Sequence, residues 1–484
     1  MCRFREMWLL ELGCVAALAA TGAAQQASVA ATPPMGWNSW DSYGLSITEP
    51  QFRANVDALR TKLKPFGWQY AVIDEGWFFE NPQDRSTPAK LHYALDHFGR
   101  YVPVPARFPS AGKAPAHTAT SSPTGVVMLP ATLEETSFAT LGAWVHAQGL
   151  QFGIHIVRGI PRASVERNLP VADSSFHAQD AADQTDACRW DPTNWGVQDN
   201  AAGQAWYDSL LKQYASWGVD YLKVDCIADH PYKVSEIRQI RRAIDKAGRP
   251  MVLSLSPGPT QLSHAEEVGT LANMWRISDD VWDRWEKAPD QTIEFPQSVK
   301  EQFSRLAAWE PYAKPGNWPD ADMLPIGQLK PSPGDGNPRA SRLTPEEHRT
   351  QVTLWAIARS PLIVGANLTL LDDATLSLLT NPDLIRVNQT ATHSAQVFNA
   401  DNLVGWRADL PGGEKAIALF NLGDTEADVT KQISDFGADL AARNWNVRSV
   451  WDGGAAVPER EFLWRLPPHG SVLLLLGVNN DSAN

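Results

Sequence analysis

Residues 217–225 read Trp-Gly-Val-Asp-Tyr-Leu-Lys-Val-Asp, a short and mostly apolar run that ends in charged side chains. Residues 205–217 before it and 234–247 after it have the periodicity of amphipathic helices, and residues 251–255 are again apolar. A short apolar run between helical segments is typical of a buried strand in a parallel sheet. This stretch therefore predicts a strand–helix–strand unit of an α/β protein.

The same alternation extends from about residue 32 to about residue 390. Eight apolar runs separated by helical segments predict a (β/α)8 barrel, the TIM-barrel fold, over residues 32–390. An open doubly wound sheet is the alternative, but no glycine-rich dinucleotide fingerprint follows the first run. We expect the eight strands at Met35–Trp40, Tyr70–Ile73, Phe152–Ile156, Tyr221–Val224, Met251–Leu255, Met274–Ile277, near Met323 and at Leu362–Val364.

Two other regions differ from this pattern. Residues 79–134 are long and rich in Pro, Ser, Thr and Ala, which predicts an elaborated loop over the carboxyl face of the barrel. From residue 395 to residue 484, short apolar runs follow one another with Gly and Asp turns and few helical signals, which predicts a small antiparallel β-sandwich domain. Its strands are expected at Val397–Phe398, Leu403–Arg407, Ala416–Asn421, Trp445–Trp451 and Ser471–Leu476.

The amino terminus has the pattern of a secretory signal peptide over residues 1–24. Arg3 and Arg5 precede a mostly apolar stretch that Glu11 interrupts, and small residues follow. We therefore expect export to the periplasm or the extracellular space. Beyond this leader only Cys188 and Cys226 remain, and either a disulfide or two buried thiols would fit the sequence.

The charge balance narrows the class of partner. The 484 residues carry a formal net charge of −13 and no basic stripe, so a nucleic acid or an anionic membrane is an unsuitable partner. No run after the leader is long and apolar enough to span a bilayer. The 20 Trp residues suit a packed core, stacking on sugar rings, or both. A neutral substrate fits this composition, and the oligomeric state stays open.

Charged side chains gather where the expected strands end. Asp74 and Glu75 follow the second run, and Lys223 and Asp225 close the fourth. Because the carboxyl ends of barrel strands meet at one face, these groups should share a site. Capping of helices by Asp is the simpler alternative for any one of them. The sixth run ends in the same way, with Arg276, Asp279 and Asp280.

Paired carboxylates without a histidine-rich metal set favour glycoside hydrolysis, in which two carboxyl groups act as nucleophile and acid/base. His155 is the one histidine at an expected strand end, so we expect neither a metal nor another cofactor. Nucleophile-elbow and P-loop motifs are absent from the sequence. The alternatives are a non-catalytic carbohydrate-binding barrel and a Schiff-base enzyme, for which Lys223 is the candidate although Asp225 disfavours its neutral form.

Six ordered motifs together resemble glycoside hydrolase family 27, the family of α-galactosidases and α-N-acetylgalactosaminidases. The resemblance implies a barrel followed by an antiparallel β domain. It also implies retaining hydrolysis of terminal α-D-galactosyl residues from a galactose-containing oligosaccharide or polysaccharide. The motifs begin at Thr32 and comprise residues 32–40, 70–77, 149–154, 217–225, 275–280 and 318–324.

The resemblance also assigns roles. Asp225 matches the nucleophile, and Asp280 matches the acid/base because it lies four residues after Arg276. Lys223 lies two residues before Asp225, so both side chains share one face of the strand, and the cation should keep the carboxylate ionised. Retention predicts carboxyl groups about 5–6 Å apart. The expected substrate-binding residues are Trp37 as an aromatic floor, Asp74 for sugar hydroxyls, and Glu75, Lys223 and Arg276.

Three departures leave the sugar open. Glu75 stands where the family usually has Asp, and its extra methylene would crowd the C6 hydroxymethyl of galactose. Within the family, β-L-arabinopyranosidases act on a sugar that lacks this group. Residues 253–259 replace the usual Cys-Glu-Trp near the sugar 2-position, and the end of the third strand, from His155 to Arg158, also differs. A bacterial-type subgroup is therefore indicated, with L-arabinopyranose and N-acetylgalactosamine as the alternatives to galactose.

Overall fold

The computed structural model describes residues 29–83, 92–112, 127–128, 136–191, 193–229, 231–293, 295–330, 337–442, 445–452, 457–459 and 461–478. The expected signal peptide lies outside these residues, as does much of the long loop expected over 79–134. Among the described helices, none is both long and apolar enough to cross a membrane.

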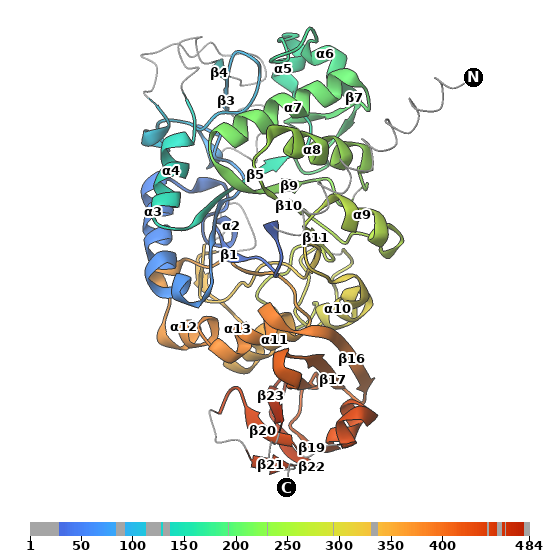
Figure 1. The fold of residues 1–484 in the computed structure, drawn as a ribbon. Helices are drawn as coiled ribbons and strands as arrows, with labels where there is room; N and C mark the ends of the chain where they lie inside the picture. The colour runs from blue at the N-terminus through green and yellow to red at the C-terminus, as the bar shows by residue number, and fades with distance from the viewer. Residues whose placement is uncertain are drawn as a thin grey trace, which may run out of the picture.

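Eight parallel strands form one curled sheet, so the predicted TIM barrel is confirmed (Figure 1). The sheet closes where Leu324 pairs with Val364 in parallel and the Leu324 amide donates to the Ile363 carbonyl at 2.7 Å. In spatial order the strands are β12 (Trp318–Asp320), β11 (Met274–Arg276), β10 (Val252–Leu255), β9 (Val219–Asp225), β5 (Gln151–Val157), β2 (Tyr70–Ile73), β1 (Met35–Asn38) and β15 (Leu362–Val364).

Helices surround the sheet, as Figure 1 shows. Of the two helices expected on either side of β9, α8 has the predicted bounds and α7 begins four residues earlier, where the Asn200 side chain accepts from the Gly203 amide at 2.7 Å. This cap explains the earlier start. The longer helices are α3 (Glu49–Ala58), α4 (Ala139–Ala147), α7 (Ala201–Ser216), α8 (Val234–Ala247), α9 (Ala265–Leu271), α10 (Gln302–Trp309), α11 (Pro345–Ile357), α12 (Asp373–Leu379) and α13 (Pro382–Thr390).

The seventh strand differs from the prediction. It was expected near Met323, but β12 covers Trp318–Asp320 and ends before that residue. Asp322 has a φ of 83°, in the left-handed region, so the extended backbone cannot continue to Met323. The strand is short and contains a proline, so it leaves little apolar signal in the sequence.

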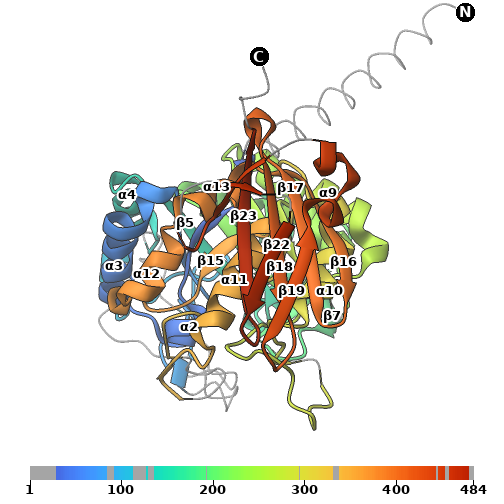
Figure 2. The same ribbon diagram turned by 90° about the horizontal axis from the view of Figure 1, so that it is seen from below.

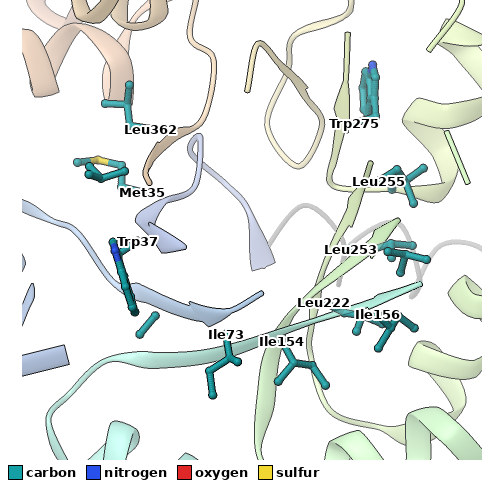
Figure 3. Close-up of a cluster of buried hydrophobic side chains, with 14 of the residues drawn as sticks. Met35, Trp37, Ile73, Ile154, Ile156, Leu222, Leu253, Leu255, Trp275 and Leu362 are labelled. Atoms are coloured by element: carbon teal, nitrogen blue, oxygen red, sulfur yellow. The ribbon is translucent and has the colours of Figure 1, made fainter. Parts of the chain in front are cut away.

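Side chains inside the barrel change character along its axis. Toward the carboxyl ends of the strands they are polar, and Asp74 contacts both Asn38 and Lys223 there. The side chains that alternate with them face the helices, and Figure 3 shows part of this outer apolar cluster. The amino-terminal end is filled by an apolar cluster of Ala30, Tyr70, Val72, Tyr221, Val252, Met274 and Trp318. The barrel is therefore filled by apolar side chains at one end and lined by charged and polar side chains at the other.

The predicted antiparallel β domain follows the barrel. Its larger sheet has the order β16 (Thr392–Ala400), β17 (Leu403–Asp409), β18 (Lys415–Asn421), β23 (Ser471–Val478), β20 (Trp445–Ser449) and β21 (Val457–Glu459). A second pair, β19 (Ala427–Gln432) and β22 (Glu461–Leu466), was not anticipated. The polar sequence of β19 explains why that strand was missed, because it offers no apolar run, whereas β22 has a short apolar run at residues 462–464.

The larger sheet of the β domain is buried on both faces. In β18, Ala416, Ala418 and Phe420 belong to the barrel core, whereas Ile417 and Leu419 belong to a separate cluster within the domain. Figure 2 shows α11 behind the sheet, and Thr350 of α11 donates to the His469 carbonyl at 2.6 Å. Burial on both faces explains why the final strand is almost continuously apolar.

Arg107 fastens the loops that follow β1 and β2 to each other. Its buried guanidinium donates to the carbonyls of Leu45 and Ile47, each at 2.6 Å, and to those of Gly76 and Phe79. Burial lowers the pKa of Arg107 to about 10, so the group stays charged at neutral pH. Because Gly76 directly follows Glu75, this one cation fixes the loop that carries a predicted site residue.

We expect Arg107→Met to lower the free energy of unfolding by roughly 3 kcal/mol or more, because it leaves buried carbonyl groups without a donor. Arg60→Met is the matched control, since Arg60 is 42% exposed and its contact with Asp57 is 3.6 Å. Chemical denaturation of both variants measures the difference. Equal midpoints for the two variants would contradict the anchoring role of Arg107.

Candidate active site

A cavity of about 350 Å³ opens at the carboxyl ends of the barrel strands. This volume lies in the range of small-molecule sites. Its walls combine carboxylates and one cation with aromatic side chains, which suits a ring with both hydroxyl groups and apolar faces. The lining residues are Trp40, Asp74, Glu75, His155, Trp190, Lys223, Asp225, Pro257, Asp279, Asp280 and Phe295.

Asp74 lies at the floor of the cavity in a network of donors. Its Oδ2 atom accepts from Asn38 Nδ2 at 2.7 Å and from Lys223 Nζ at 2.9 Å. Its Oδ1 atom accepts from the Glu75 amide at 2.8 Å. Burial would raise the pKa of Asp74, but the charges of Lys223 and His155, with the hydrogen bonds from Lys223 and the Glu75 amide, together lower that pKa below its usual range. Asp74 is therefore a fixed anion that can accept hydrogen bonds from a ligand.

Asp225 ends β9 and receives donors on both carboxylate oxygens. The Trp190 indole Nε1 donates to Oδ1 at 3.1 Å, and the Ser256 hydroxyl donates to Oδ2 at 3.3 Å. His155 Nε2 lies 3.4 Å from the same Oδ2. These contacts hold the carboxylate in one orientation at the cavity wall.

The electrostatics keep Asp225 ionised. Burial raises the pKa of its carboxyl, but the His155 contact and the charges of His155 and Lys223 lower it below its usual range. For Lys223 the directions are reversed. Burial alone would lower the pKa of its ammonium group, but the carboxylates of Asp74 and Asp225 raise it. The predicted effect of Lys223 on Asp225 is therefore present, although the direct contact of Lys223 is with Asp74.

Asp280 lines the same cavity from the segment after β11 and is backed by Arg276. Arg276 Nη2 donates to Asp280 Oδ1 at 3.1 Å, and its Nη1 contacts Asp322 Oδ1 at 2.7 Å. Burial, with Asp280 and Asp320 nearby, raises the pKa of Asp322 despite the Arg276 cation. Arg276 is almost fully buried, so it reaches the cavity through Asp280.

Trp37 is not part of the cavity, which corrects the expectation that it forms the aromatic floor. Its side chain is fully buried, packs on Phe52 of α3 and donates to the Ala366 carbonyl at 2.8 Å. Asn38 points into the barrel, so the alternation of β1 turns Trp37 outward. Trp40, three residues later, lines the cavity instead.

Cys188 and Cys226 form a disulfide with a Cα–Cα distance of 5.9 Å, which resolves the open choice between a bond and two thiols. The bond ties the segment that carries Trp190 to the residue after Asp225. Arg158 supports the same place, since it donates to the Cys226 carbonyl at 2.6 Å and to Asp186 at 2.9 Å. The indole donor of Trp190 is thus fixed covalently beside Asp225.

The two carboxylates are held differently. Asp225 is 16% exposed, is surrounded by donors and stays anionic, whereas Asp280 is 34% exposed and has one cation behind it. Within the described residues, no group of three or more His, Cys, Asp and Glu side chains is arranged to hold a metal ion. The arrangement suits a nucleophile paired with a proton donor.

Comparison with known proteins identifies the family. The crystal structure of a family 27 β-L-arabinopyranosidase from Geobacillus stearothermophilus is 36% identical in sequence to this chain. The match covers 95% of this chain and 99% of the arabinopyranosidase, with a TM-score of 0.82. The chain belongs to glycoside hydrolase family 27. In this family 27 glycosidase, the family profile described as alpha galactosidase A matches residues 197–390, and that of the alpha galactosidase C-terminal beta sandwich domain matches residues 400–476.

Other relatives of the family 27 glycosidase differ in the sugar they are named for. A putative α-N-acetylgalactosaminidase from Bacillus halodurans is 34% identical, covers 93% of this chain and 98% of its own, and has a TM-score of 0.76. Alpha-galactosidase A of Cellvibrio japonicus is 28% identical over 98% of this chain and 99% of its own length. The family is therefore certain, whereas its members' names span three glycones.

Sequence reasoning missed several groups around Asp225. His155 was noted only as a strand-end histidine, yet it pairs in register with Lys223, and that register was not available from the sequence. Ser256 lies in the segment that departs from the family pattern. Trp190 had no signal beyond its position two residues after Cys188, because only the disulfide brings it to the nucleophile candidate.

The disulfide should contribute about 3–4 kcal/mol to stability, because it closes a loop of 38 residues. We expect a reducing agent to lower the thermal midpoint of the wild type. A double variant, Cys188→Ala with Cys226→Ala, should have a low midpoint that the reductant leaves unchanged. Calorimetry with and without reductant tests this, and a fully reduced wild type with an unshifted midpoint would refute it.

Proposed function

We propose that this family 27 glycosidase is a retaining exo-enzyme that removes terminal β-L-arabinopyranosyl residues in preference to α-D-galactosyl residues. Asp225 attacks the anomeric carbon while the bond to the leaving oxygen breaks, and Asp280 gives its proton to that oxygen. Asp280 then takes a proton from water, which displaces Asp225 and returns the sugar with its configuration retained. The single observation that carries the glycone preference is the place of Glu75 in the cavity.

The surroundings of the two carboxylates support these roles. A nucleophile must be ionised and oriented, and Asp225 has a lowered pKa and donors on both oxygens. A proton donor needs access to the leaving group, and Asp280 is the more exposed of the two. The predicted separation of about 5–6 Å between the carboxyl groups stays a prediction.

Glu75 supports the arabinopyranoside preference. Its side chain lines the cavity next to Asp74 and is 5% exposed, so its extra methylene takes up cavity space that Asp would leave open. Arg107 donates a hydrogen bond to the carbonyl of Gly76, the residue after Glu75, which limits any outward movement of Glu75. β-L-Arabinopyranosides have the ring configuration of α-D-galactosides without the C6 hydroxymethyl, so they fit the reduced space.

The comparisons support the same proposal. A variant of the Geobacillus stearothermophilus β-L-arabinopyranosidase was solved in complex with arabinose and is 36% identical to this chain, with a TM-score of 0.81. Hydrolysis of α-D-galactosides is the second candidate function. It is favoured by the α-galactosidase from Cellvibrio japonicus, which matches this chain over nearly its whole length.

Azide separates the roles of the two carboxylates. With an activated aryl β-L-arabinopyranoside, Asp225→Gly plus azide should give an α-L-arabinopyranosyl azide, since azide enters the vacated space with inversion. Asp280→Gly plus azide should give the β-L azide, because the covalent intermediate still forms on Asp225. Proton NMR of the products assigns each anomer. An exchange of the two outcomes would reverse the proposed roles.

Replacing Glu75 tests the sugar preference. Glu75→Asp should raise the kcat/KM for an aryl α-D-galactoside, relative to that for the aryl β-L-arabinopyranoside, by about tenfold, the usual effect of one methylene in a pocket. Glu75→Gln is the matched control, since it keeps the length and removes the charge, and its ratio should stay near the wild-type value. If Glu75→Asp leaves the ratio unchanged, Glu75 does not read the C6 position.

A further inference from the structure

We infer that Phe295 forms a binding site for the leaving group, one that selects leaving groups presenting the apolar face of a ring. Phe295 lines the catalytic cavity yet is 39% exposed, and Ile293 on the same loop is 63% exposed. Two of the six exposed large apolar side chains in the described part of the chain therefore lie on one loop, and Phe295 is the one of these two that lines the cavity. This inference rests on the proposed function.

The loop that carries Phe295 is attached to the proposed acid. The Gln297 amide donates to the Asp280 carbonyl at 2.8 Å, and the Trp282 amide donates to the Gln297 carbonyl at 3.1 Å. Gln291 Nε2 donates to the Pro296 carbonyl at 2.8 Å, which braces the residue next to Phe295. Phe295 thus lies two residues from the backbone contact that holds Asp280.

The chemistry of the reaction fixes which part of the substrate Phe295 meets. The acid must lie beside the oxygen that leaves, so side chains anchored to it border the leaving group. The glycone instead belongs with the polar network of Asp74, Glu75 and Lys223, which come from strands on the other side of the cavity order. Phe295 is therefore placed next to the leaving group.

The side chain also defines the class of leaving group. An aromatic ring offers an apolar face that a sugar ring or an aryl group can cover, and covering it removes apolar surface from water. Trp190 and Pro257 add further apolar surface to the cavity lining. A second sugar or an aryl group fits this wall, whereas a small leaving group gains nothing from it.

Phe295→Ala should lower kcat/KM about tenfold for 4-nitrophenyl β-L-arabinopyranoside. It should leave kcat/KM for β-L-arabinopyranosyl fluoride unchanged, because fluoride has no ring to contact Phe295. Phe295→Tyr should keep wild-type values on both substrates, since it retains the ring face. Leu463→Ala is the matched control, because Leu463 is 80% exposed on the C-terminal domain and should affect neither substrate.

Three outcomes overturn the inference. An equal loss on both substrates would show that Phe295 supports the glycone site or the fold, and no loss on either would show that it does not contact the leaving group. A wild type that cleaves neither arabinopyranosyl nor galactosyl fluoride would refute the proposed function and the inference with it. If only the galactosyl compounds react, the arabinopyranoside preference fails, and the same comparison with galactosyl fluoride and aryl galactoside decides the role of Phe295.

Discussion

The buried ammonium of Lys223 is the constraint on which the active end of the barrel depends. Asp74 lies 2.9 Å from it, and Asp225 lies on the same face of the same strand. Without a cation inside the barrel, two carboxylates at this depth would favour their neutral forms. The positive charge keeps Asp74 available as a hydrogen-bond acceptor and, together with His155, lowers the pKa of Asp225, the proposed nucleophile. The curl of the sheet therefore matters chemically, since it lets Asp74 after β2 and Asp225 at the end of β9 share one charge although β5 lies between these strands.

A second cation, Arg276, organises the part of the cavity that Asp280 lines in a different way. Arg276 is surrounded by Asp280, Asp320 and Asp322, and these carboxylates raise its pKa although burial opposes them. Only Asp280 of these carboxylates lines the cavity. A flat guanidinium can hold two carboxylates at fixed angles, which an ammonium cannot do. The proposed acid thus has an oriented support, whereas the proposed nucleophile is fixed by neutral donors and a nearby charge.

The sequence was sufficient to predict the barrel, the β domain and the charged residues at the strand ends. The periodicity of apolar residues determines the strands and helices, and the charged residues directly follow the apolar runs. It was insufficient where a side chain's direction mattered. The resemblance placed Trp37 in the site, although the inward direction of Asn38 leaves Trp37 facing the helices. The position of Trp190 beside Asp225 depends on a covalent bond between distant residues. The end of the short strand at Trp318 depends on one residue in the left-handed region, so neither feature leaves a local sequence pattern.

The order of strands in the C-terminal sheet has a consequence for biosynthesis. β23, the last described strand, lies between β18 and β20 and supplies one side of both pairings. Until the ribosome has made β23, the sheet consists of separate halves, and the apolar surface of α11 lacks part of its cover. Folding during translation can therefore complete the barrel before this domain, because β23 follows every other strand of the sheet in the chain. Truncation of the chain before β23 would therefore remove the middle of a sheet rather than an edge.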